Sequence, residues 1–109
     1  LIFPEISEQI KQLNDTGEMF YALFKRYRGG SFSTGLKMYD STAVAYLLAP
    51  EIYTLSNEYV AIETKGELTQ GASIIDINKK MGKEENAVVA VSVDADAFRK
   101  WFVAAVEKC

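Results

Sequence analysis

The prediction of the fold starts from Met38-Tyr39-Asp40-Ser41-Thr42-Ala43-Val44-Ala45-Tyr46-Leu47-Leu48-Ala49-Pro50-Glu51-Ile52-Tyr53. An acidic residue, Asp40, stands just before a short apolar run. We expect a helix that begins near Ser41, with Asp40 as its N-cap. Pro50 should end this helix, because the residue before a proline avoids helical backbone angles. Since residues 43–48 are apolar almost all round, the helix should be buried.

Two further helices are expected before this stretch. Pro4 suits the first turn of a helix, and Asp15 with Glu18 three residues later is typical of a capping box that opens a second. Gly29 and Gly30 should end the second helix, and residues 31–35, small and polar, should form a loop. The second helix carries an apolar stripe made of Met19, Phe20, Leu23, Phe24 and Tyr27.

After the central helix, the pattern changes to that of strands. Strands are expected at residues 59–64, 73–77 and 87–93, the last being rich in β-branched side chains. Residues 78–86 are charged and polar, and should form an exposed loop. Asp94 should cap a final helix whose apolar residues recur at offsets of three and four. The prediction is an α+β fold over residues 1–109 as a single domain, with N-terminal helices, a small mainly antiparallel sheet or hairpin, and a C-terminal helix.

Charge and composition exclude several classes of protein. The net charge is −3 with both signs interspersed, whereas a nucleic-acid surface needs clustered cations. The one basic cluster, Lys25-Arg26 with Arg28, suits a helix C-terminus. No apolar run is long enough to cross a membrane, and no signal-peptide pattern opens the sequence. We therefore expect neither nucleic acid nor membrane as a partner, and a cytoplasmic location.

The sequence has no histidine and one cysteine, Cys109, at its end. The lack of histidine excludes a Ser-His or Cys-His pair within this sequence. A single cysteine excludes an internal disulfide and fits a reducing compartment.

Three segments of the sequence resemble the inosine-uridine-preferring nucleoside hydrolases. In that family a His-Asp pair opens a helix of the form Ala-Val-Ala-Tyr-Leu-Leu-x-Pro-Glu, as Asp40 does here. The segment from Ile62 to Gly71 is similar to a hairpin of the family, and Val91 to Asp94 to its final strand. The resemblance covers nearly all of this sequence but only the last third of a typical member. The aspartate cluster of the family's N-terminal part, Asp-x-Asp-x-x-x-Asp-Asp, is absent.

The resemblance implies roles for two residues. Asp40 matches a ligand of the family's active-site calcium, and Tyr39 stands where the family has the histidine that serves the departing nucleobase. Two other interpretations remain open: Asp40 can simply cap its helix, and Tyr39 can be a packing aromatic. Tyr27, similarly, either lines the nucleobase side or packs in the core. Glu63, Glu67 and Asp76 are interpreted as solvated surface carboxylates.

The first hypothesis is a C-terminal fragment of a calcium-dependent nucleoside N-ribohydrolase, inactive and binding no calcium by itself. Its substrate, once the site is completed, would be a purine or pyrimidine ribonucleoside. One alternative is a non-catalytic module that associates with itself as a homo-oligomer, or with a partner, through exposed apolar surface. The other is one half of a split enzyme completed in trans. The sequence leaves open whether this chain is itself an enzyme.

Overall fold

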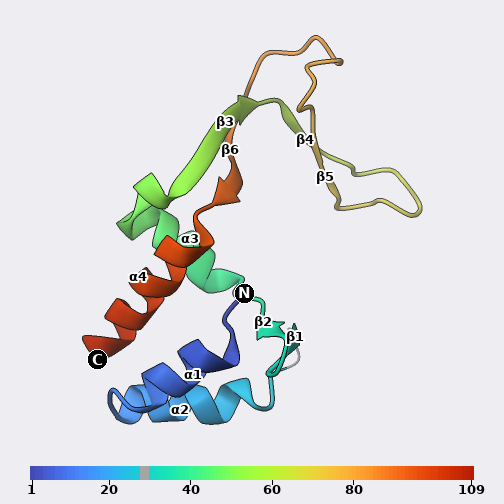
Figure 1. Ribbon diagram of the computed structural model, residues 1–109. Helices are drawn as coiled ribbons and strands as arrows, with labels where there is room; N and C mark the ends of the chain where they lie inside the picture. Colours follow the sequence, from blue (N-terminus) through green and yellow to red (C-terminus); the bar gives the residue numbers. More distant parts are fainter. Residues whose placement is uncertain (28–29) are drawn as a thin grey trace. The chain divides into compact units, whose positions relative to one another are not determined.

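The protein is described by a computed structural model that covers residues 1–27 and 30–109 (Figure 1). The contacts divide it into two compact units, residues 1–52 with 93–109 and residues 53–92. The predicted α+β class is confirmed, while the prediction of one domain stays a prediction. The described residues form four α-helices, α1 (Pro4–Lys11), α2 (Asp15–Phe24), α3 (Asp40–Leu48) and α4 (Ala95–Glu107). None of them is of the length and apolarity that crossing a bilayer requires.

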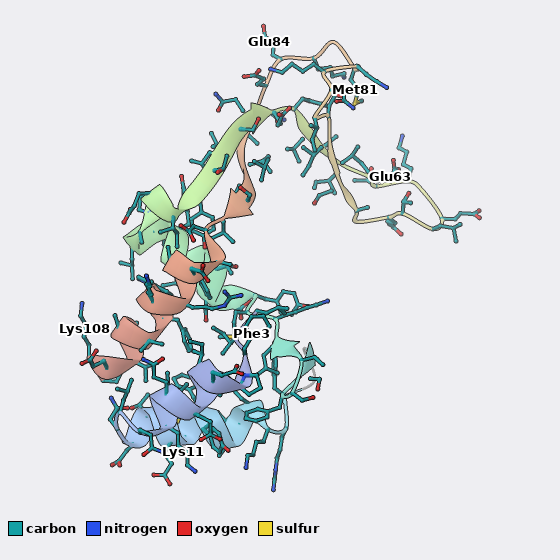
Figure 2. The ribbon with its side chains drawn as sticks, viewed as in Figure 1. Phe3, Lys11, Glu63, Met81, Glu84 and Lys108 are labelled. Atoms are coloured by element: carbon teal, nitrogen blue, oxygen red, sulfur yellow. The ribbon has the colours of Figure 1, made fainter. Side chains whose placement is uncertain are left out.

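The core of the first unit lies where α1 and α2 pack on each other and on α4. Figure 1 shows α1 and α2 as neighbouring helices joined by a short connection, and Figure 2 labels Phe3 just before α1 and Lys11 at its end. The α1–α2 contact is close because Gly17 has no side chain: a Cβ there would lie 1.8 Å from the carbonyl oxygen of Ile10. The aromatic centre of this core is formed by Phe20, Phe24, Phe98 and Phe102, with ring centroids 5.8–6.5 Å apart.

The N-cap of α2 is Asn14 rather than the predicted Asp15. The backbone of Asn14 is extended, and its side-chain oxygen accepts a hydrogen bond from the N–H of Gly17 at 2.8 Å. Its side-chain nitrogen donates to the carbonyl oxygen of Val106 in α4 at 2.7 Å. Asp15 is therefore the first helical residue, where its charge suits the positive end of the helix dipole.

The segment after α2 differs from the prediction of a plain loop. The helix ends at Phe24, before the glycines, of which Gly29 lies outside the described residues, as does Arg28. β1 (Gly30–Ser31) pairs antiparallel with β2 (Gly35–Leu36). The turn between them requires a glycine at position 35, where φ is +113°, a region that residues with a Cβ rarely adopt.

The second unit consists of paired strands. β3 (Tyr53–Glu58) pairs with β6 (Ala87–Val93), and β4 (Val60–Ile62) pairs antiparallel with β5 (Ser73–Ile75). The predicted strand 87–93 is confirmed with the same bounds, those predicted at 59–64 and 73–77 are shorter, and β3 was not predicted. The amide side chain of Asn86 joins the two pairs, since it both accepts from the N–H of Val60 and donates to its carbonyl oxygen, at 2.8 and 3.0 Å.

The C-terminal helix follows the sequence pattern closely. Asp94 caps α4, as predicted, and its carboxylate accepts from the N–H of Ala97 at 3.1 Å. The apolar face of α4 is buried through Phe98, Phe102 and Val106. Through this face, α4 packs against α1 and α2.

The prediction that the central helix is buried is wrong. α3 begins at Asp40, with Tyr39 at its N-cap, and ends at Leu48 before the 3-10 turn η1 (Pro50–Ile52). Ala45 is the residue of α3 that is fully buried, whereas the large apolar residues of the helix are exposed. The physical reason is that the described chain contains no element that covers this outer face.

Candidate functional site

A cavity of about 250 Å³ lies at the start of α3. Some of its lining residues come from the end of α2 and the segment that follows this helix. The others come from the connection between β2 and α3 and from the first residues of α3. The residues that line the cavity are Phe24, Tyr27, Lys37, Met38, Tyr39, Asp40 and Ser41. The three residues singled out in the sequence, Tyr27, Tyr39 and Asp40, therefore meet around one hollow.

Asp40 presents an exposed carboxylate to this cavity. It is the first residue of α3, and Tyr39 occupies the N-cap position, so the interpretation of Asp40 as an N-cap is wrong. The carboxylate is among neither of the two ion pairs of the described residues. The dipole of α3 still favours a negative charge here, and both carboxylate oxygens can coordinate a cation.

Tyr39 is the residue immediately before Asp40, and its side chain is 61% exposed. The described residues therefore leave most of this ring uncovered. Thr42 holds the backbone at this point, because both its hydroxyl and its N–H donate to the carbonyl oxygen of Tyr39. The phenol of Tyr39 is thus presented on a tight turn at the rim of the cavity.

Tyr27 also lines the cavity, and its side chain is exposed. Beside it lies Phe24, which is buried and anchors this end of α2 in the core. A planar base could stack against an exposed aromatic ring of this kind. Tyr27 is therefore a candidate wall residue rather than part of the core, as the sequence left open.

Sequence reasoning missed one charged residue of the cavity and a second hollow beside it. Lys37 lines the same cavity as Asp40, and its position three residues earlier was the only signal. A second cavity of about 300 Å³ also reaches Asp40 and Ser41 and is otherwise apolar. It is lined in addition by Phe20, Val44, Trp101, Phe102, Ala105, Val106 and Cys109.

Two other carboxylates that were considered in the sequence, Glu63 and Asp76, stabilise local turns. Glu63 accepts from the N–H groups of Lys65 and Gly66, both at 2.9 Å, and so shapes the turn after β4 (Figure 2). Asp76 accepts in the same way from the N–H groups that follow β5, at 2.9 and 3.0 Å. Neither is part of an acidic cluster within the described residues.

The donor set around Asp40 fits one share of a calcium site but not the whole. Calcium takes six to eight oxygen ligands, of which one carboxylate supplies one or two. Within residues 1–27 and 30–109, no three side chains of His, Cys, Asp or Glu lie close enough together to hold a metal ion. The other ligands of such a site would have to come from outside these residues.

Comparisons with known proteins agree with the resemblance found in the sequence. A sequence model described as "Inosine-uridine preferring nucleoside hydrolase" matches residues 2–100. The chain is 43% identical over 101 residues to the non-specific ribonucleoside hydrolase RihC of Salmonella enteritidis, which covers 93% of this chain and 33% of that protein. It is 44% identical over 109 residues to RihC of Salmonella schwarzengrund, covering all of this chain and 35% of that protein.

A solved structure supports the fold. The purine-preferring ribonucleoside hydrolase from Gardnerella vaginalis superposes with a TM-score of 0.71 at 22% identity, over 99% of this chain and 36% of that one. The chain thus spans about a third of the length of the relatives it matches. Because the sequence model of the family covers nearly the whole chain, this chain belongs to the inosine-uridine-preferring nucleoside hydrolase family, of which it represents the C-terminal portion.

Proposed function

We propose that this chain is the C-terminal part of a calcium-dependent nucleoside N-ribohydrolase and that it supplies Asp40 as one calcium ligand. The observation that carries the proposal is the exposed carboxylate of Asp40, which forms no ion pair with another described residue and lies at the start of α3, in a cavity lined by Tyr27 and Tyr39. The substrate is a purine or pyrimidine ribonucleoside, since the relatives are named ribonucleoside hydrolases and the description of the family names inosine and uridine.

Within this proposal, the residues of the chain bind and orient rather than complete the reaction. Tyr27 offers a ring on which a nucleobase stacks. Tyr39 offers a phenol that donates a hydrogen bond to the departing base, although a phenol is a weaker acid than the imidazolium of the family's histidine. Calcium, when bound, would hold the attacking water and the ribose hydroxyls, and Asp40 alone provides too few ligands for it.

The first expectation is that the chain alone hydrolyses no nucleoside and binds calcium weakly. Purified protein is incubated with inosine or uridine and calcium, and the released ribose is measured, while calorimetry measures calcium affinity. Steady release of ribose that follows the protein through purification would contradict the proposal.

The second expectation concerns a chimaera that joins the N-terminal two thirds of Salmonella enteritidis RihC to this chain. The chimaera should release ribose, and Asp40→Asn should lower kcat at least 100-fold and weaken calcium binding. Tyr39→His, which restores the pattern of the family, should raise kcat. Met81→Glu, in the exposed loop of the second unit, is the matched control and should change neither value. An Asp40→Asn chimaera with unchanged kcat and calcium affinity would refute the role of Asp40.

A second candidate function is non-catalytic association, either of the chain with itself as a homo-oligomer or with a partner. The observation that favours it is the exposure of large apolar side chains on α3, since such patches mark contact surfaces. Sedimentation at rising concentration should show a dimer or larger species, and a stable monomer at high concentration would argue against self-association. We also propose a cytoplasmic location, with neither nucleic acid nor membrane as partner, for which the dispersed charge and the single free cysteine give support.

A further inference from the structure

Lys37 is the only cation among the described residues that line the cavity at the start of α3. The backbone before it is anchored, because Leu36 is fully buried and exchanges two hydrogen bonds with Ile2, at 2.8 and 2.9 Å. The backbone after it is anchored where Thr42 donates to the carbonyl oxygen of Tyr39. The side chain of Lys37 is exposed. A short segment that is held at both ends therefore presents an ammonium group to the cavity.

Lys37 and Asp40 carry opposite charges in one cavity but do not pair with each other. Neither residue belongs to the two ion pairs found among the described residues. The ammonium group attracts negatively charged atoms of a ligand, and the carboxylate attracts a cation. A ligand that fills the cavity thus meets a positive group at one place and a negative group at another, so its own charges decide which of its parts faces Lys37.

The hydrolysis of a nucleoside creates a negative charge that the intact nucleoside does not have. When the N-glycosidic bond breaks, its electron pair moves onto the base and spreads over the ring nitrogens and carbonyl oxygens. A lysine side chain offers three N–H donors and a positive charge. A charge-assisted hydrogen bond is about twice as strong as a neutral one, so Lys37 suits this developing charge better than the neutral phenol of Tyr39 does.

We propose that Lys37 is a catalytic residue that stabilises the negative charge on the departing nucleobase. This inference rests on the proposed function, because it places nucleoside hydrolysis at this cavity. The bond between C1′ of the ribose and the base nitrogen breaks, and its electron pair stays with the base. The oxygen of a water molecule bonds to C1′ and gives up one proton to the solvent, from which the base takes up one proton. The ammonium group of Lys37 stays charged and donates a hydrogen bond to the base throughout.

The chain by itself tests whether Lys37 recognises charge on a base, because Lys37 and the two tyrosines of the cavity all belong to it. The probes are barbiturate and uracil, two planar pyrimidines of which only barbiturate is an anion at neutral pH. Nuclear magnetic resonance follows the amide shifts of residues 37–41 as each probe is added. Barbiturate should bind roughly fivefold more tightly than uracil, because its hydrogen bond to the ammonium group joins two charges.

Three variants of the chain test the source of this preference. Lys37→Met should abolish the preference for barbiturate, and Lys37→Arg, which keeps the charge, should retain it. Lys80→Met removes an exposed lysine of the second unit and should leave the preference unchanged. Because the side chains at both positions are exposed, the circular dichroism of the variants should match that of the parent chain.

A second test uses the chimaera with the N-terminal two thirds of Salmonella enteritidis RihC. Its substrates are uridine and 4-nitrophenyl β-ribofuranoside, whose nitrophenolate leaving group is a stable anion that needs little help to depart. Lys37→Met should lower kcat for uridine roughly 100-fold, the usual effect of losing one donor to a developing charge. KM for uridine should stay within about threefold, because the charge forms only in the transition state. For 4-nitrophenyl β-ribofuranoside, kcat should also stay within about threefold.

The two tests separate this inference from the proposed function. A chimaera that hydrolyses neither substrate contradicts the proposed function, and the binding of barbiturate to the chain then decides the role of Lys37. That role is overturned if barbiturate does not bind, if both probes bind equally, or if the preference survives in Lys37→Met. An active chimaera in which Lys37→Met leaves kcat for uridine unchanged overturns it as well, while the proposed function stands. An equal fall of kcat for both substrates also overturns it, because Lys37 would then act on the fold or on calcium rather than on the base.

Discussion

Asn14 joins the start of α2 to α4, and replacing it provides the sharpest test of how the first unit is held together. Its side-chain oxygen caps α2 through Gly17, and its nitrogen donates to the carbonyl oxygen of Val106, 92 positions away in the sequence. The two bonds can be removed separately. Asn14→Asp keeps an oxygen for the cap but loses the donor, whereas Asn14→Ala loses both.

The magnitudes follow from the two contacts. Loss of a helix N-cap costs about 1 kcal/mol, and loss of the part-buried hydrogen bond to the carbonyl oxygen of Val106 costs about 1 kcal/mol more. Asn14→Ala should therefore lower the free energy of unfolding by about 2 kcal/mol, and Asn14→Asp by about 1 kcal/mol. For a chain of this size, about 2 kcal/mol corresponds to a fall in Tm of roughly 10 °C.

The assay is urea unfolding followed by the fluorescence of Trp101, the only tryptophan. The midpoint should fall in the order parent, Asn14→Asp, Asn14→Ala, with an unchanged slope, because the same surface is exposed on unfolding. Asn57→Ala, at an exposed asparagine of the second unit, is the control and should leave the midpoint unchanged. Equal midpoints for Asn14→Asp and Asn14→Ala would refute the assignment of a separate energy to the bond with Val106.

Two further predictions concern a close contact and a titrating pair. In the same unfolding assay, Gly17→Ala should destabilise the first unit by more than about 1 kcal/mol, because its Cβ would lie 1.8 Å from the carbonyl oxygen of Ile10. The control is Gly82→Asn, at an open position with φ of +62°, which should be tolerated. The hydrogen bond from Lys79 to Glu85 raises the pKa of that lysine above its usual 10.5, so the pair stabilises the fold below that pH and its contribution is lost as the pH rises through the raised pKa. Nuclear magnetic resonance titration should show the pKa of Lys79 falling in Glu85→Gln, and an unchanged value would contradict the pairing.

Local sequence patterns predicted an element correctly where the residues of the element and of its cap are adjacent in the sequence. β6 has the predicted bounds because β-branched residues dominate it, and Asp94 caps α4 because no competing cap residue adjoins it. At α2, two good capping residues are adjacent, and the choice of Asn14 over Asp15 depends on the carbonyl group of Val106. No local pattern contains that information.

The candidate site was predicted in part. Asp40, Tyr39 and Tyr27 were singled out in the sequence, and the fold brings them to one cavity. Lys37 and Trp101 were missed, because their places depend on the path of the chain between β2 and α3 and on how α4 packs. The burial expected for α3 failed for a different reason, since apolar residues on a helix predict a covering partner without saying whether that partner is in the same chain.

The pairing of strands in twos has a consequence for handling this protein. In the described residues, β3, β4, β5 and β6 each have one partner, so each carries a row of N–H and C=O groups on its free edge. Free edges of this kind recruit further strands, and isolated two-stranded pairs are marginally stable in water. Edge-to-edge growth from residues 53–92 should thus contribute to loss of material on storage, and charged substitutions along those edges should slow it.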